Sequence, residues 1–330
     1  LSWEHILTYC EAILRVYNLY GRRDNMYKAR IKILVKALGI DKFRDLVEKE
    51  WEFIKNGPNT INNSELNRVK AFFTEPHYIK DTKNDLESHI QDKSFSQWLS
   101  RCTQSHKKKH YRSVTLSLKS NHQAPGDATS EQMQYVADLA DEYSFGEIRV
   151  SHEQNLILAD VHEDNLYELW NKAKNLNLAT PNIGLITDII CCPGGDFCSL
   201  ANAKSIPIAD SIQQVFDDMD YLHDIGDIDL NISGCMNACG HHHVGHIGIL
   251  GVDKDGSEWY QVTLGGNQGN FANIGKVIGP SFSADEMPAV IRKIVDTYVK
   301  ERHSDETFID CVIRVGLEPF KLMVYGKKAN

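Results

Sequence analysis

Apolar residues recur every three or four positions at the start of the chain, as at Ile6, Ile13 and Val16, and this spacing predicts an amphipathic helix. Similar patterns follow, with one interruption at 56–64, where Gly, Pro, Asn and Ser indicate a turn and a new helix cap. We therefore expect residues 1 to about 105 to be mostly helical.

After Tyr111 the apolar positions alternate with polar ones in short runs, which is typical of strands. The order of elements that we predict is a strand at 114–118, a loop at 120–127, a helix at 129–143, strands at 147–151 and 155–161, and a helix at 163–176. This β-α-β-β-α order is typical of a ferredoxin-like half-domain, whose helices are buried on one face of the sheet.

The last part of the chain again mixes helices and strands. We predict a helix-like stretch at 199–219, strands at 229–233, 246–252 and 259–265, and a last helix at 284–302. The fold class is therefore α+β, with an N-terminal helical segment at 1–105, the ferredoxin-like half-domain at 106–180, and an α/β domain at 181–330.

The composition describes an ordinary globular chain. Of 330 residues, 42% are hydrophobic and 25% are charged, and the net charge is −9, which argues against nucleic acid as a partner. No apolar run approaches the roughly 18 residues that span a bilayer, and no signal peptide is visible. We therefore expect no membrane partner and a cytoplasmic protein. The basic stretch 106–112 is interpreted first as solvated surface, and second as a docking site for an acidic electron donor.

Five of the eight cysteines lie between residues 191 and 239, which favours a metal site over a disulfide framework. Cys192 and Cys198 form a C-x5-C pair, and Cys235 and Cys239 form a C-x3-C pair. Four thiolates are the usual ligands of a 4Fe-4S cluster. Structural zinc sites normally have the tighter C-x2-4-C spacing, which favours the cluster. A zinc-stabilised structural or binding module is the alternative.

The sequence around these cysteines resembles a known family. The stretches CCPGGDFCSLANAKS (191–205), ISGCMNACGHHHVGHIGILG (232–251) and YQVTLGGN (260–267) are similar to the signature of the sulfite and nitrite reductases that contain sirohaem and a 4Fe-4S cluster. The resemblance extends to GEIRVSHEQNLILADV (146–161) and to the helix motif NLYGRRDNMYKARIKILVKALG (18–39). It matches the C-terminal portion of such a haemoprotein.

The resemblance implies a 4Fe-4S cluster bound by Cys192, Cys198, Cys235 and Cys239. It also implies that the sulfur of Cys239 is the axial ligand of the sirohaem iron, which makes Cys239 the catalytic cysteine. Cys192 is the better register for the first ligand, since it alone gives C-x5-C, and Cys191 is then a spare thiol.

Sirohaem carries many carboxylates, so its pocket needs Arg, Lys and amide donors. The family motifs place the following candidates there: Arg23, Arg30, Lys32, Arg149, Gln154, Asn155, Asn237, Gly265, Gly266 and Asn267. The residues alone also permit a solvated helix face for Arg23, Arg30 and Lys32, and a hairpin cap for Gln154 and Asn155. The adjacent histidines 241–243 point in different directions, so we do not expect them to bind one ion.

The activity that the resemblance implies is that of an assimilatory sulfite reductase, which reduces sulfite to sulfide with six electrons. Nitrite reduction to ammonia is the alternative within the family, and an iron–sulfur carrier or an inactive truncated relative are further alternatives. We expect a small oxyanion substrate and an external electron donor, either ferredoxin or an NADPH-flavoprotein, because no G-x-G-x-x-G fingerprint occurs. The chain begins at Leu1 inside a helical pattern, so we expect an N-terminally incomplete piece whose missing half carries the substrate-binding Arg and Lys residues.

Overall fold

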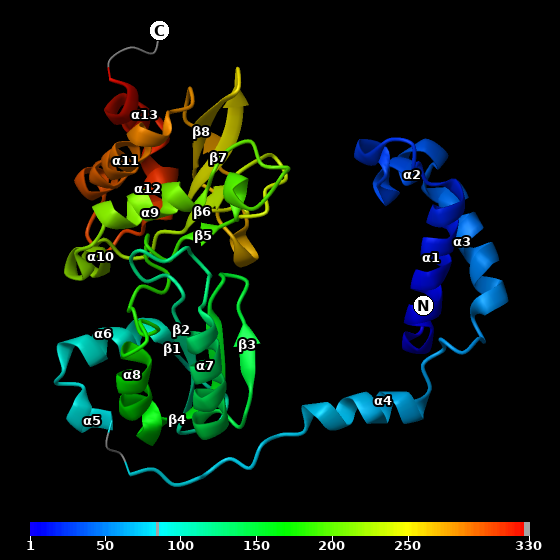
Figure 1. Ribbon diagram of the computed structural model, residues 1–330, viewed down its shortest axis with the longest axis horizontal. Coiled ribbons are helices and arrows are strands. Elements are labelled where there is room, and N and C mark those ends of the chain that lie inside the picture. The colour runs from blue at the N-terminus through cyan, green and yellow to red at the C-terminus, as the bar shows by residue number, and fades with distance from the viewer. Residues whose placement is uncertain (84–85, 327–330) are drawn as a thin grey trace. The chain divides into compact units, whose positions relative to one another are not determined.

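The computed structural model describes residues 1–83 and 86–326, so the end of the predicted domain 181–330 lies outside the described residues (Figure 1). The contacts within the chain define two units, Leu1–His77 and Tyr78–Asn330, and each is described by itself below. The domain boundaries predicted at about 105 and 180 stay predictions.

The first unit is helical. Its α-helices are α1 (Ile6–Tyr20), α2 (Ile31–Leu38), α3 (Ile40–Ile54) and α4 (Asn63–Lys70). A small core of buried apolar side chains lies between α1, α2 and α3, and includes Val16, Leu34 and Val47. The predicted break at 56–64 is confirmed: α3 ends before it, and the Asn62 side chain caps α4 by accepting the Glu65 N–H (2.8 Å).

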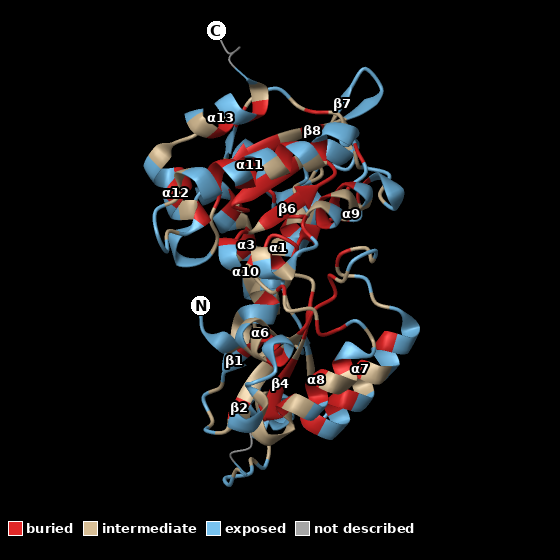
Figure 2. Ribbon diagram, turned by 90° about the vertical axis from the view of Figure 1, so that its left-hand side faces the viewer, coloured by how far each residue is buried: buried red, intermediate tan, exposed pale blue. Residues whose placement is uncertain are grey.

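The second unit begins with the predicted half-domain. Its elements are α5 (Leu86–His89), α6 (Lys93–Cys102), β1 (Thr103–Ser105), β2 (Tyr111–Leu116), α7 (Ser130–Tyr143), β3 (Ile148–Val150), β4 (Leu156–His162) and α8 (Leu166–Lys174). The strands form an antiparallel sheet in the order β1-β2-β4-β3. Apolar residues of α6, α7, α8, β2 and β4 share one core, and Figure 2 shows the buried positions on α7 and β4. The predicted β-α-β-β-α order is confirmed, with the short β1 added at its start.

The remainder of this unit contains a second sheet. Its elements are β5 (Ile190–Cys191), α9 (Ile206–Val215), α10 (Met219–Ile225), β6 (Leu230–Ser233), β7 (Ile247–Lys254), β8 (Ser257–Leu264), β9 (Lys276–Val277), α11 (Met287–Glu301), α12 (Phe308–Val315) and α13 (Glu318–Tyr325). The strand order is β5-β6-β7-β8-β9; β5, β6 and β7 are parallel to one another, and the other pairs are antiparallel. Side chains of β6, β7, β8, α9 and α11 form the largest core.

The single helix predicted at 199–219 is wrong in its extent. Residues 199–205 are irregular, α9 begins only at Ile206, and α10 follows after a break. Pro207 explains the late start, because proline fits the first turn of a helix and not its interior. Asp218 explains the break, since its side chain accepts the N–H groups of Asp220 and Tyr221 and caps α10.

Candidate cluster and cofactor site

The two cysteine pairs lie on loops that follow neighbouring parallel strands. β5 ends at Cys191, so Cys192 is the first residue of one loop, and β6 ends at Ser233, two residues before Cys235. Cys191 pairs in register with Ile232, and the Cys192 N–H donates to the Ile232 carbonyl (3.1 Å). Carboxyl ends of adjacent parallel strands are a common place for ligands. The sheet therefore brings the starts of both loops together.

Close packing of glycines joins the two loops. The Gly234 N–H donates to Sγ of Cys192 (3.1 Å), and the Gly234 carbonyl accepts the N–H groups of Asn202 (2.8 Å) and Ala203 (3.1 Å). A Cβ atom on Gly234 would lie 2.6 Å from the Ala203 carbonyl oxygen and 2.9 Å from Cα of Gly194. Any side chain at position 234 would therefore push the loops apart.

The surroundings of Cys192 suit a thiolate. The side chain is buried, it accepts the N–H of Gly234, and the Ser205 hydroxyl lies 3.5 Å from its sulfur. Ser205 is the N-cap of α9, so the positive end of that helix points toward Cys192. The neighbouring Cys191 donates its S–H to the Cys192 carbonyl (3.2 Å), and burial raises the pKa of the Cys191 thiol. This geometry favours Cys192 over Cys191 as the first ligand.

The second pair lies on a tight turn. Cys235 is buried and Cys239 is exposed, and Ala238 between them has a φ of 57°, which turns the chain sharply. A Cβ atom on the following Gly240 would lie 1.9 Å from the Ile232 carbonyl oxygen, so only glycine fits there. Asn237 is exposed on the same turn. The Cys239 sulfur and the Asn237 amide are thus accessible to a group outside the loops.

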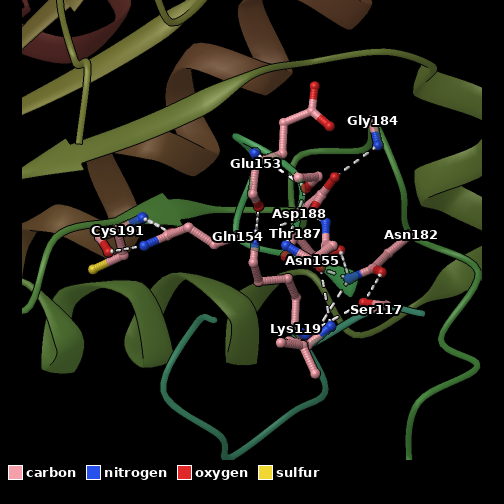
Figure 3. A network of polar contacts seen from close by, with 12 residues as sticks. Ser117, Lys119, Glu153, Gln154, Asn155, Asn182, Gly184, Thr187, Asp188 and Cys191 are labelled. Carbon is pink, nitrogen blue, oxygen red and sulfur yellow. Dashed lines mark hydrogen bonds and ion pairs between the residues drawn. The ribbon is translucent and has the colours of Figure 1, made fainter. Parts of the chain in front are cut away.

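Gln154 and Asn155 bind protein groups (Figure 3). The side-chain amide of Gln154 accepts the N–H of Cys191 and donates to its carbonyl, both at 2.8 Å. Asn155 is fully buried, with its amide between Asp188 Oδ1 (3.0 Å) and the Leu118 N–H (3.0 Å). Residue types and spacing gave no sign of these contacts, because they join segments that are distant in the sequence.

The other candidates in this unit differ in their surroundings. Arg149 lies exposed on the edge strand β3 and forms an ion pair with Glu147. The loop of Gly265, Gly266 and Asn267 packs beside the segment that follows the second cysteine pair: the Gly265 N–H donates to the His246 carbonyl (3.1 Å), and a Cβ atom on Gly266 would lie 2.3 Å from the Gly245 carbonyl oxygen. The N–H groups of Gly265 and Asn267 are both engaged within the protein, the latter by Asn273.

The basic motif lies in the first unit, and its residues are exposed. Arg30 is the N-cap of α2, and Lys32 lies in the first turn of that helix. Arg23 lies between α1 and α2, where its guanidinium donates to Asn18 Oδ1 (2.5 Å) and covers the Tyr17 ring at 5.2 Å. The interpretation of all three as one face of a single helix is therefore wrong.

Burial alternates along the histidine run, although the ring centroids of His242 and His243 lie 3.9 Å apart. His241 and His243 are exposed, whereas His242 is buried. Within the described part of the chain neither ring nitrogen of His242 has a hydrogen-bond partner, and burial lowers its pKa to about 4. His246 accepts the Asp229 N–H at Nδ1 (3.1 Å).

Comparison with protein families identifies this arrangement. Residues 1–55 and 185–330, more than half of the chain, match the nitrite and sulphite reductase 4Fe-4S domain, and residues 104–176 match the nitrite/sulfite reductase ferredoxin-like half domain. The chain belongs to the nitrite and sulfite reductase family. The family and the fold class predicted from the sequence are thereby confirmed.

Individual relatives include both kinds of reductase. The chain is 26% identical to sulfite reductase [ferredoxin] 1 of Mycolicibacterium paratuberculosis, covering 94% of this chain and 51% of that protein. It is 25% identical to ferredoxin–nitrite reductase of Synechococcus elongatus, covering 88% of this chain and 50% of that protein. The solved structure of the Mycobacterium tuberculosis NirA protein has the same fold, with a TM-score of 0.62, 24% identity and coverage of 95% of this chain and 53% of that one. The chain spans about half the length of these relatives.

The 4Fe-4S domain and the reductase relatives imply two cofactors, a 4Fe-4S cluster and sirohaem. Among residues 1–83 and 86–326 no group of three or more His, Cys, Asp or Glu side chains converges on a single-ion site. A cluster makes a different demand, since each of its four cysteines binds a separate iron. Four sulfur donors on two loops joined by hydrogen bonds, one of them to sulfur, fit the cluster. The exposed Cys239 fits a thiolate shared with a further group.

No helix among residues 1–83 and 86–326 combines the length and the apolar character that crossing a membrane requires.

Proposed function

We propose that this chain forms the cluster-binding portion of a sulfite reductase. The observation that carries the proposal is the pair of cysteine loops, joined at the ends of β5 and β6 by the Gly234 N–H to Cys192 Sγ bond. Cys192, Cys198, Cys235 and Cys239 are the cluster ligands, and Cys239 is shared with the sirohaem iron. When bound, these cofactors would pass on electrons from an external donor and would present an iron on which a small oxyanion is reduced.

The described residues have definite roles in this proposal. The Gly234 N–H and the N-terminal end of α9 stabilise negative charge on the Cys192 sulfur, because each presents a positive dipole to it. The turn at Ala238 holds Cys239 exposed, so its thiolate is accessible to the tetrapyrrole. The exposed Asn237 amide lies on the same turn, where it would donate to a ring carboxylate or a cluster sulfur.

The remaining contacts to the tetrapyrrole follow from the family motifs. Arg23, Arg30, Lys32 and Arg149 are exposed cations that can pair with ring carboxylates. Gly265, Gly266 and Asn267 form the backbone beside the segment that follows the second cysteine pair. The amides of Gln154 and Asn155 bind protein groups instead.

Sulfite is the first choice of substrate and nitrite the second. The relatives carry both names, and both reactions consume six electrons. Ferredoxin is the proposed electron donor, since both relatives are named for it. The cytoplasm is the proposed location, because it keeps thiols reduced.

The test is the metal content and absorption spectrum of the native protein that contains this chain, purified without oxygen. About five irons per chain with chlorin-type bands are expected, the sum of one four-iron cluster and one sirohaem. A colourless protein with about one zinc per chain would support the structural zinc module instead. Iron and sulfide without a tetrapyrrole would support a simple electron carrier.

Cys239→Ser tests the shared ligand. The variant is expected to lose the chlorin bands and sulfite reduction, because a serine hydroxyl is a poor ligand for iron. Cys10→Ser, at an exposed thiol in the first unit, is the matched control and should keep both. Normal sulfite reduction by Cys239→Ser would show that the shared-ligand assignment is wrong.

A further inference from the structure

Gln154 completes the hydrogen bonding of an edge strand. β5 has two residues and lies at the edge of its sheet, so among residues 1–83 and 86–326 one side of its backbone has no neighbouring strand. The Gln154 amide occupies that side and bonds both the N–H and the carbonyl of Cys191 at 2.8 Å (Figure 3). A side chain from the ferredoxin-like half-domain thereby pairs with the strand that leads into the cluster loop.

The peptide group between Cys191 and Cys192 is held from both sides. Its carbonyl oxygen, on Cys191, accepts the Gln154 amide, and its N–H, on Cys192, donates to the Ile232 carbonyl (3.1 Å). A peptide group is planar and rigid, so two bonds on opposite edges fix the orientation of the whole plane. That plane fixes the N–Cα bond of Cys192, to whose Cα the cysteine side chain is attached.

The turn that carries Gln154 is itself tightly built. Gln154 has a φ of 60°, an uncommon backbone conformation for a residue other than glycine. The Ser151 hydroxyl accepts the N–H groups of Glu153 (3.2 Å) and Asn155 (3.1 Å), and closes the turn. Gly126 packs against it so closely that a Cβ atom there would lie 2.9 Å from Cβ of Gln154.

A buried ion pair fastens the same turn to the segment that precedes β5. Lys119 is almost fully buried, and its ammonium donates to the Glu153 carbonyl (2.8 Å) and to Asp188 Oδ1 (3.0 Å). Asn155 donates to the same carboxylate oxygen (3.0 Å), and the other oxygen of Asp188 accepts the Gly184 N–H (3.1 Å). A buried ion pair with these additional hydrogen bonds holds one geometry. The turn is thus fixed to the chain at both Asp188 and Cys191.

We infer that Gln154 is a positioning residue for the cluster ligand Cys192, and that Lys119, Asp188 and Asn155 hold Gln154 in place. The inference rests on the proposed function in one respect, namely that Cys192 is a ligand. The family motif in the sequence placed Gln154 and Asn155 at the tetrapyrrole, and the positioning role differs from that prediction. In this structure both amides bind the protein, and Gln154 acts through the backbone of the cysteine segment.

The experiment compares Gln154→Met with wild type. Methionine has a similar length and keeps the side chain unbranched, but it neither donates nor accepts the two hydrogen bonds. Each of the two hydrogen bonds stabilises the closed state of the Cys191 amide modestly. Without them, this amide is expected to exchange its hydrogen roughly tenfold faster than in the wild type. Iron should also be lost to a chelator roughly tenfold faster from the loaded protein, by the same reasoning.

Two further variants separate positioning from general damage. His152→Gln changes an exposed residue of the same turn and should match wild type in both measurements. Gln154→Glu keeps an acceptor for the Cys191 N–H but places a carboxylate oxygen against its carbonyl. It should therefore preserve slow exchange of the Cys191 amide while accelerating alkylation of Cys192 in iron-free protein, which remains informative if Gln154→Met does not fold.

Amide exchange and alkylation are measured without the cluster, so they separate the two proposals. An absence of iron from the purified wild-type protein would overturn the proposed function. Amide exchange at Cys191 and alkylation of Cys192 would still decide whether Gln154 fixes the orientation of Cys192. If both Gln154 variants match His152→Gln in exchange at Cys191 and in alkylation of Cys192, the positioning role is wrong.

Discussion

Replacement of Gly234 by alanine tests how closely the two cysteine loops must approach. The added methyl group would lie 2.6 Å from the Ala203 carbonyl oxygen, 2.9 Å from Cα of Gly194 and 3.1 Å from the Ser205 hydroxyl. Two of these atoms belong to the backbone, so no side-chain rotation relieves the contact. The loops must separate instead.

The magnitude follows from the contacts at this position. Overpacking of a tightly packed site costs about 1–3 kcal/mol. Separation of the loops also weakens the three hydrogen bonds of Gly234, those to Cys192, Asn202 and Ala203, which contribute about 1 kcal/mol each. Since the loops either keep the clash or separate and weaken the bonds, only one of the two costs applies, and we expect a loss of roughly 1–3 kcal/mol. At about 2 °C per kcal/mol for a unit of this size, the thermal midpoint should fall by roughly 2–6 °C.

The assay is thermal unfolding together with the iron content of protein purified without oxygen. Gly195→Ala is the matched control, because it lies in the same loop, its added methyl group would meet no atom closer than 3.4 Å, and its φ is not positive. We expect this control to keep the iron content and the thermal midpoint of the wild type. Gly234→Ala should have a lower iron content and a lower thermal midpoint. Equal behaviour of the two variants would refute the argument that the loops are in close contact at Gly234.

Two further predictions concern stability away from the cysteine loops. Thr129→Ala removes the capping box of α7, in which the Thr129 hydroxyl and the Gln132 side chain each accept the other's N–H, and should lower the free energy of unfolding by about 1 kcal/mol in urea, whereas Thr129→Ser should be near neutral. Arg314 lowers the pKa of Glu306 from 4.5 to about 2, so this pair contributes stability above pH 4.5 that is lost as the pH falls toward 2. Glu306→Gln should flatten that part of a stability profile measured between pH 2 and 6; an unchanged slope would show that the pair contributes nothing to acid stability.

The regular elements of the half-domain could be predicted because its apolar residues recur at the spacing that a strand or a helix requires. Alternation identified β2, β3 and β4, and the helix predicted at 129–143 agrees with α7 to within one residue at its start. β1 was missed because three residues with a single buried position carry too little pattern to recognise. The start of α9 was placed too early because the apolar spacing before Pro207 resembled a helix.

The site divides in the same way between local and distant determinants. The spacing of the cysteines and their neighbouring glycines are local features, so the assignment of these loops to the cluster could be made from the sequence, and it stays a prediction. The roles of Gln154 and Lys119 depend on contacts with Cys191 and Asp188, which lie far away in the chain. Nothing in the sequence near Lys119 distinguishes a fully buried ammonium from an ordinary surface lysine.

The parallel pairing of β5 and β6 has a consequence for the maturation of the protein. Parallel neighbours need a long crossover, here the segment that contains α9 and α10, so the first and second cysteine pairs meet only after that segment has folded. The nascent chain thus has a C-x5-C pair without its partners for the time that synthesis of the crossover takes. Once the sheet has formed, its own backbone hydrogen bonds hold the starts of both cysteine loops together.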